Sequence, residues 1–478
     1  MKGSLKLPFL LKKSIYLSKL VYMSKLPLLE KNAYLTIVVK DNAIWSHLAY
    51  VDYNSDVQYI LSDYTDISHL NRRLDDHIFG GSFWSEYFDL LQKNFDWKLI
   101  QSVEGGLNRM VDFKDENYGV SGIKVLVDDN QQFLTNIFFS ISQYSHDIAV
   151  RILDTPNMRK LIGKLSEKLG YEDLIYIDLD INSFQIYRVE RGKEQVRKDK
   201  LPNQYKYSEV VQQWKSEIGL IDAVKDRRLH AFMAADIHNS QLENSWANLT
   251  IHPVDILLDQ NLTDILRSFT TIQLLSLLTD NRKKLERIGE VESKTLIVIG
   301  GKIPRLLGKK TTLLSIIDGL ELYGQFDVIW DNECKLLAYG ISTAMGSEST
   351  DIVIGRNDII SGITKVLIPE LKSKKAVNKV IFSAIYRSQE YEPESILVLG
   401  DTFEMIEIKN RVNKVVFEGK FEGNVYMPSL KDQKLEFVSA PLGVRYDNLL
   451  IDSRLRPIVY GMDSYSNKLK INKWTNAN

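Results

Sequence analysis

The order of strand-like and helical segments limits what this chain of 478 residues can fold into more than its composition does. Three short β runs separated by turn residues follow one another from Tyr34 to Leu61, and segments with helical periodicity come after them. A second series of the same kind begins at Leu174. A β-meander followed by helices, occurring twice, predicts two α/β units, and the length leaves room for about three structural units in all.

The segments between and after the two meanders have patterns of their own. Apolar residues at helical spacing predict helices within residues 64–100, 133–142, 156–169, 207–218 and 254–288. Apolar runs predict strands over residues 123–127, 148–153 and 295–299. Beyond residue 346 short β runs separated by Gly, Asp and Asn dominate, which predicts a β-rich module of the barrel or sandwich kind.

These patterns divide the chain into four parts. We expect a basic, apolar segment over residues 1–30, a first α/β lobe over 31–170, a second α/β lobe over 171–345 and a β-rich module over 346–478. The predicted fold class is therefore α/β, with two lobes and a C-terminal β-rich module.

The charge balance and the cysteine content exclude several classes of partner and site. Lys and Arg number 61 against 62 Asp and Glu, which leaves a net charge of -1, so we expect no nucleic-acid partner. The single cysteine, Cys334, cannot form an intramolecular disulfide, which fits a reducing cytoplasm. The 7 histidines show no spacing typical of zinc ligands, so no histidine metal site is predicted.

Residues 1–30 carry six lysines and a single acid, Glu30, among apolar residues. Their uncharged runs are too short for a membrane-spanning helix, but a helix lying on an anionic membrane surface fits this composition. The alternatives are a disordered tail and a translation start at Met23 in place of Met1. We therefore expect a cytoplasmic protein. The alternative is a cytoplasmic protein that binds peripherally to the inner membrane.

Three segments carry a resemblance to a known superfamily. The segment from Leu174 to Ile186 is a strand ending in Asp178, a turn and a second strand, and Leu296 to Gly301 is an apolar strand that runs into two glycines. Asp331 to Ala344 follows and contains several small residues. In this order the segments resemble the second phosphate motif, the adenosine motif and the connecting helix of the actin-like, sugar-kinase and heat-shock ATPase superfamily. Its cell-division and pilus-assembly actin homologues and the accessory proteins of glutamate mutase are the most similar in motif order.

The resemblance implies a duplicated, ribonuclease H-like fold of two lobes with a nucleotide site between them. ATP and Mg²⁺ would be the cofactors, and the residues near them would be Asp178, Asp180, Asn182, Ser183, Gly300 and Gly301. Because Asp178 and Asp180 lie two apart on a strand, they project from one face and could share a cation; the alternative is a pair of turn carboxylates. The two glycines could instead begin a loop, and Asp331 is best explained as a helix N-cap.

The chain also departs from the pattern of the superfamily. Asp180 and Asn182 stand where glycine is expected, so side chains would crowd a phosphate and Asp180 would repel it. The first hairpin, from Val38 to Ala43, lacks the usual strand-end Asp and its glycine; the alternative is that Asp41 takes the place of this Asp from a shifted position. We therefore expect weak or absent ATP hydrolysis.

Three functions are compatible with these observations. The first is a cytoplasmic assembly or scaffold component, of the cell-envelope, pilus or division type. It has a nucleotide-binding or degenerate site and acts on protein partners through the C-terminal β module. The second is a catalytically silent scaffold that holds no nucleotide. The third is a small-molecule phosphotransferase with Asp178 or Asp180 as the base, for which the sequence shows no sugar pocket.

Overall fold

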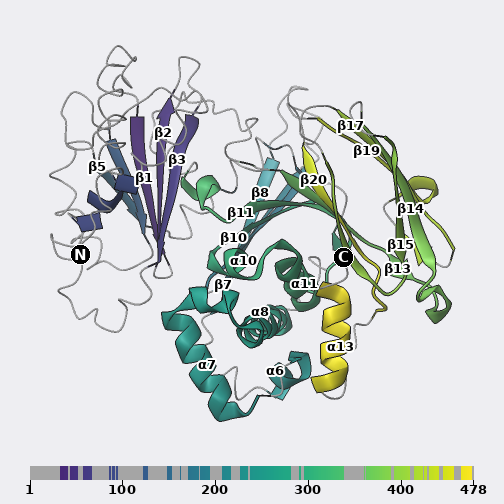
Figure 1. Ribbon diagram of the computed structural model, residues 1–478. Helices are drawn as coiled ribbons and strands as arrows, with labels where there is room; N and C mark the ends of the chain where they lie inside the picture. The colour runs from purple at the N-terminus through teal and green to yellow at the C-terminus, as the bar shows by residue number, and fades with distance from the viewer. Residues whose placement is uncertain are drawn as a thin grey trace, which may run out of the picture.

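The computed structural model shows a first sheet, a second sheet with helices beneath it and a C-terminal sheet beside it (Figure 1). None of its described helices is long and apolar enough to cross a membrane. The structure describes residues 33–40, 43–51, 57–66, 122–127, 148–152, 171–181, 184–193, 207–216, 227–234, 237–280, 290–291, 295–338, 362–388, 392–409, 414–423, 425–427, 430–440, 445–456 and 464–475, with single residues at 162, 169 and 360 and most of 86–94.

The first sheet begins with the expected meander. Strands β1 (Ala33–Lys40), β2 (Ala43–Val51) and β3 (Val57–Asp66) pair in antiparallel fashion. β4 (Gly122–Val127) and β5 (Ile148–Ile152) then add in parallel on the other side of β1. The order is β3-β2-β1-β4-β5, and all five strands confirm the expectation from the sequence.

The second sheet repeats this arrangement. β6 (Asp173–Leu179), β7 (Phe184–Lys193) and β8 (Tyr207–Ser216) form an antiparallel meander, and β10 (Thr295–Gly300) and β11 (Tyr323–Asp331) add in parallel beside β6. The order β8-β7-β6-β10-β11 is the same as in the first sheet. The expected α/β fold of two ribonuclease H-like lobes, the actin-like ATPase fold, is therefore confirmed.

One element differs from the expectation. The sequence pattern predicts a helix over residues 207–218, but Tyr207–Ser216 is strand β8. Its backbone pairs with β7 along its whole length. Since Val and Trp also favour strands, pairing with a neighbouring strand decides between the two structures.

Helices cover one face of the second sheet. The apolar stripe expected on α8 is buried, but α8 starts after residue 254 because Pro253 opens a separate 3-10 turn. The helical elements are α6 (Arg227–Phe232), α7 (Asn239–Ile251), η2 (Pro253–Leu257), α8 (Gln260–Asp280), α10 (Lys302–Leu307) and α11 (Lys309–Gly319).

In the first lobe, the helix expected within residues 64–100 is present in the described residues between 86 and 94. Tyr87 and Leu91 are buried, whereas Leu90, expected on the same stripe, is 47% exposed. The beginning of the expected range is strand, because β3 continues to Asp66.

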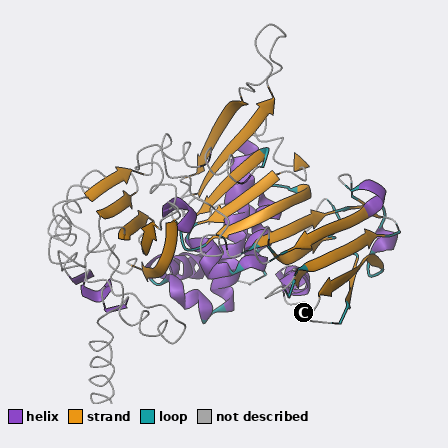
Figure 2. Ribbon diagram, turned by 90° about the horizontal axis from the view of Figure 1, so that it is seen from above, coloured by secondary structure: helices purple, strands orange, loops and turns teal. Residues whose placement is uncertain are grey.

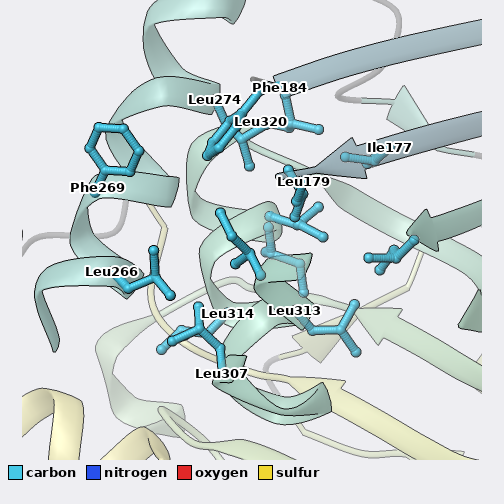
Figure 3. Close-up of a cluster of buried hydrophobic side chains, with 14 of the residues drawn as sticks. Ile177, Leu179, Phe184, Leu266, Phe269, Leu274, Leu307, Leu313, Leu314 and Leu320 are labelled. Carbon is cyan, nitrogen blue, oxygen red and sulfur yellow. The ribbon is translucent and has the colours of Figure 1, made fainter. Parts of the chain in front are cut away.

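The second sheet has an apolar core on each of its faces. Ile177 of β6 packs in the cluster formed with α8 and α11 (Figure 3). Tyr176 and Val298 point the other way, because successive strand residues alternate between faces. They share a cluster with Trp45 of the first lobe, so the two lobes have a common apolar core.

Strands from the C-terminal region extend the second sheet. β12 (Ile363–Ile368) pairs with β11, β20 (Tyr446–Asp452) pairs with β12, and β16 (Phe403–Glu407) pairs with β20. The two-residue strand β9 (Glu290–Val291) also pairs with β11. The sheet therefore continues across the boundary expected at residue 345, and the four domain ranges stay predictions.

The remaining C-terminal strands form smaller sheets. They agree with the β-rich character predicted for the region beyond residue 346. Side chains of the four-stranded sheet and of β12 and β20 share one core, so the two sheets pack against each other. Figure 2 shows the smaller sheet beside the larger one, near the end marked C. The elements are β14 (Val380–Ser388), β15 (Glu394–Leu399), β17 (Val415–Phe421) and β19 (Lys434–Ser439), the two-residue strands β13 (Glu370–Leu371) and β18 (Val425–Tyr426), and the turns η3 (Lys374–Ala376) and η4 (Lys431–Gln433).

A helix near the C-terminus, α13 (Ser464–Thr475), was not expected from the sequence. It buries Ile471 and Trp474. The side-chain amide of Asn467 donates hydrogen bonds to the carbonyls of Ala231 and Met233, at 2.8 and 3.1 Å. Contacts with the second lobe, rather than a strong local pattern, account for this helix.

A buried arginine joins the C-terminal segment to the second lobe. The guanidinium of Arg454 donates to both oxygens of Asp318 on α11, at 2.6 and 3.0 Å, and to Asp452 at 2.8 Å. It also lies 5.0 Å from the ring centre of Phe403 and 4.8 Å from that of Trp474. The charges of the two carboxylates balance the burial of this cation.

We expect Arg454→Ala to lower the free energy of unfolding by about 3–5 kcal/mol, because it removes the buried cation that Asp318 and Asp452 share and leaves Asp452 with Arg456 alone. Arg387→Ala is the matched control, since Arg387 pairs with Glu418 at 3.8 Å on the surface. This substitution should lower the free energy of unfolding by less than about 1 kcal/mol. Urea denaturation monitored by circular dichroism measures both. Equal losses in the two variants would contradict the structural role of Arg454.

Candidate functional site

Lys40, at the end of β1, reaches from the first lobe to the end of β6 in the second lobe. Its ammonium contacts the carboxylate of Asp178 and lies 2.8 Å from Oδ2 of Asp180. All three residues are buried, with 2%, 7% and 3% of their surface exposed. We call this group the Lys40–aspartate cluster.

The charges within the cluster hold it in its ionised form. Burial by itself would lower the pKa of Lys40, but the negative charges of Asp178 and Asp180 outweigh this effect and raise the pKa well above its ordinary value. Lys40 is therefore an ammonium ion at every physiological pH.

A second ion pair joins the lobes, and in this one the second lobe supplies the lysine and the first lobe the aspartate. The ammonium of Lys302, at the start of α10, lies 2.9 Å from Oδ2 of Asp66 at the end of β3. The backbone N–H of Lys302 also donates to Oδ1 of Asp180 at 2.8 Å. Asp180 thus accepts from a side chain of one lobe and from the backbone of the other.

The structure brings together four of the six site residues that the sequence predicts. β10 pairs with β6 so that Gly300 lies opposite Asp178, and Gly301 is next to Leu179. Asp180 follows directly. The other two predicted residues, Asn182 and Ser183, lie outside the described residues.

The two glycines allow the chain to approach itself closely. Gly301 has a φ of 97°, and a Cβ atom there would lie 2.3 Å from the carbonyl oxygen of Leu179. A Cβ on Gly300 would lie 2.6 Å from the hydroxyl oxygen of Tyr176. Packing between β6, β10 and α10 therefore accounts for both glycines without a nucleoside.

Asp331 lies three residues before the N-cap position of the short helix that follows β11, which Cys334 occupies, but its side chain accepts hydrogen bonds at the start of this helix. Its Oδ1 accepts a hydrogen bond from the backbone N–H of Leu336 at 2.9 Å, and its Oδ2 accepts from the hydroxyl of Tyr176 at 3.1 Å. Burial is the main influence on this carboxyl and raises its pKa to about 6, against the hydrogen bonds and the charge of Lys40.

The described arrangement does not fit a bound Mg²⁺. Asp178 and Asp180 already contact an ammonium, so a metal ion would first have to displace Lys40 from between them. Within the described ranges no group of three His, Cys, Asp or Glu side chains is placed to hold a metal. The assignment of these residues to ATP and Mg²⁺ stays a prediction.

A cavity of about 240 Å³ lies between the lobes near the Lys40–aspartate cluster. Arg305 of α10 and Glu333 line it from the second lobe. The first lobe contributes Trp45, His47, Ser62, Asp63 and Tyr64 from β2 and β3.

Sequence reasoning missed this cavity and Lys40. Lys40 stands at the end of an apolar strand, where the resemblance predicts an aspartate, and nothing near it in the sequence indicates its partners. The positive charge of Lys40 is complementary to the negative charge of Asp180, which stands where glycine is expected. This complementarity is the one feature of the sequence from which their contact could have been predicted.

Three solved structures show the range of likeness to other proteins. A non-polymerisable quadruple mutant of pCBH ParM is 11% identical with a TM-score of 0.32, over 65% of this chain and 98% of that one. A Bacteroides thetaiotaomicron protein with an actin-like ATPase fold and unknown function is 10% identical with a TM-score of 0.27, over 65% and 96%. The type II variant of the Aquifex aeolicus Ppx/GppA phosphatase is 9% identical with a TM-score of 0.27, over 56% and 67%.

No protein-family model and no curated protein matches the chain. Because the three TM-scores lie below 0.5, the fold assignment is drawn from the duplicated sheet order of this structure.

We expect Lys40→Met to lower the free energy of unfolding by about 3–5 kcal/mol, because two buried carboxylates lose their counter-ion. Adding Asp178→Asn and Asp180→Asn should recover most of this loss, since no unpaired charge then remains. The control is Lys409→Met, which breaks a 2.9 Å pair with Glu394 at a site more than half exposed. Urea denaturation compares the variants, and a triple variant no more stable than Lys40→Met would contradict the explanation.

Asp331 predicts a specific pH dependence. Because its folded pKa of about 6 exceeds its ordinary value, its contribution to stability is fully present below about pH 4 and is lost as the pH rises through 6. The free energy of unfolding of the wild type should therefore fall relative to that of Asp331→Asn, by up to about 3 kcal/mol, as the pH rises from 4 to 7. Urea denaturation from pH 4 to 7 tests this, with Glu243→Gln on the exposed face of α7 as control; a constant difference would contradict it.

Proposed function

We propose that this protein is a catalytically silent scaffold with an actin-like fold, whose lobes are joined by its own side chains rather than by a nucleotide. The observation that carries the proposal is the buried ammonium of Lys40 between Asp178 and Asp180. In the superfamily that the motifs resemble, the corresponding strand ends face each other across the phosphates of ATP.

The electrostatics of the cluster support a role without nucleotide. Inserting a metal-bound triphosphate would separate Lys40 from its two partners and expose the phosphates to the negative charge of Asp180. Separating a buried ion pair has a cost of several kcal/mol, which nucleotide binding would first have to supply. The two lobes therefore have a stable closed arrangement of their own.

The C-terminal strands support the scaffold part of the proposal. β15 lies at the end of the four-stranded sheet, and Leu397 and Leu399 on it are 65% and 42% exposed. An extended segment of a partner protein can add to such an edge and cover alternate apolar residues. A cytoplasmic assembly role, with residues 1–30 contacting a membrane surface, belongs to the same proposal.

A nucleotide-binding protein is the second candidate. It is favoured by the position of Gly300 directly opposite Asp178 at the ends of two parallel strands. In this candidate Lys40 leaves the cluster, and Asp178 and Asp180 would face the Mg²⁺ ion of a metal-bound nucleotide.

Calorimetric titration of the purified full chain with ATP and ADP, with and without Mg²⁺, distinguishes the two. We expect no saturable binding up to millimolar nucleotide and no phosphate release, because the cluster holds its own cation. Circular dichroism of the same sample confirms that the protein is folded. Mg²⁺-dependent ATP binding that is lost in Asp178→Ala would overturn the silent scaffold in favour of the second candidate.

A further inference from the structure

The cavity between the lobes has walls from both of them and is distinct from the Lys40–aspartate cluster. Its aromatic side is formed by Trp45 and Tyr64, whose ring centres are 5.4 Å apart on neighbouring strands. Arg305 of the second lobe lies over the ring of Tyr64, 4.1 Å from its centre. A molecule in this cavity would contact both lobes at once.

The size of the cavity limits the ligand. At about 240 Å³ it is larger than the roughly 150 Å³ that accommodates benzene and smaller than the roughly 300–1,000 Å³ of sites for drug-sized ligands. A nucleoside triphosphate exceeds it. A metabolite with about ten heavy atoms or fewer fits.

The charges of the cavity limit the ligand further. Among the described residues Arg305 forms no ion pair; its guanidinium lies over the face of Tyr64, and its positive charge contributes to the lowered pKa of Glu333. Its N–H groups are therefore available for a carboxylate. Glu333 supplies negative charge to the same space, and its carboxylate pairs with the ammonium of Lys335 at 2.6 Å. Burial would raise the pKa of Glu333, but the hydrogen bond and charge of Lys335 lower it below its ordinary value, so Glu333 is anionic at neutral pH.

We propose that this cavity binds a small zwitterion of the α-amino acid class. The carboxylate of the ligand pairs with Arg305, its ammonium faces Glu333, and its side chain lies against Trp45 and Tyr64. Aromatic rings next to carboxylates favour an ammonium group, and a planar guanidinium favours a carboxylate. A simple anion or a simple cation matches only half of this lining.

Such a ligand would strengthen the contact between the lobes. Because it binds the folded form alone, it raises the stability of the protein with its concentration. This inference is independent of whether the Lys40–aspartate cluster excludes a nucleotide, because the two sites use different residues.

The test is a thermal-shift screen of the full chain against the twenty amino acids at millimolar concentration, followed by calorimetric titration of the best one. We expect saturable binding by at least one amino acid. Its decarboxylated amine and its deaminated acid should each bind at least tenfold more weakly, because each lacks one of the two charges. An amino acid that binds no better than these two analogues would overturn the proposal, as would a screen without binding.

Variants locate the site. Arg305→Gln and Glu333→Gln should each weaken the amino acid at least tenfold while the melting temperature without ligand stays close to that of the wild type, since both side chains are exposed. Lys372→Gln is the matched control, because Lys372 lies over the ring of Tyr426, 4.9 Å from its centre and in the C-terminal region. Binding that is unchanged in Arg305→Gln would place the ligand elsewhere and overturn the assignment.

Discussion

The ammonium of Lys40, buried between two carboxylates of the other lobe, is the interaction on which the arrangement of the lobes depends. A buried lysine is tolerated only with its counter-ions in contact, and those counter-ions are present only when the lobes are closed. The ion pair between Lys302 and Asp66 imposes the same condition, but here the second lobe supplies the cation and the first lobe the carboxylate. The polar contacts between the lobes therefore specify one relative position, while the shared apolar core around Trp45 supplies non-directional stabilisation.

Much of the fold could be predicted from the sequence because its strands are specified locally. The runs at β1 to β3 and at β6 and β10 combine β-branched and apolar residues with clear turn residues, so their type does not depend on distant partners. β8 and α13 were missed for the opposite reason. Pairing with β7 decides the structure of β8, and burial of Trp474 against the second lobe decides that of α13. Neither partner is visible in the local pattern.

The candidate site divides in the same way. The proximity of Asp178, Asp180 and Gly300 could be predicted, because strands that run in parallel end at the same edge of a sheet. Lys40 could not be placed there, because it precedes Asp178 by 138 residues and lies on the other lobe. The sequence also could not show why Gly300 and Gly301 are glycines. A close approach of the chain to Leu179 and a close approach to a nucleoside both require glycine.

The contacts of the first lobe with the second come from a single face of its meander. In the sheet register Lys40 lies opposite Ala43 and Ala43 opposite Asp66, while Trp45 lies opposite Tyr64. Residues that are directly opposite one another share a face, so the two ion pairs and the aromatic side of the cavity form adjacent rows of one rigid surface. A rotation that opened the ion-paired row would also widen the cavity. A molecule held in the cavity therefore opposes the same motion as Lys40 does, and a small ligand can reinforce the closed form of this fold without any phosphate between the lobes.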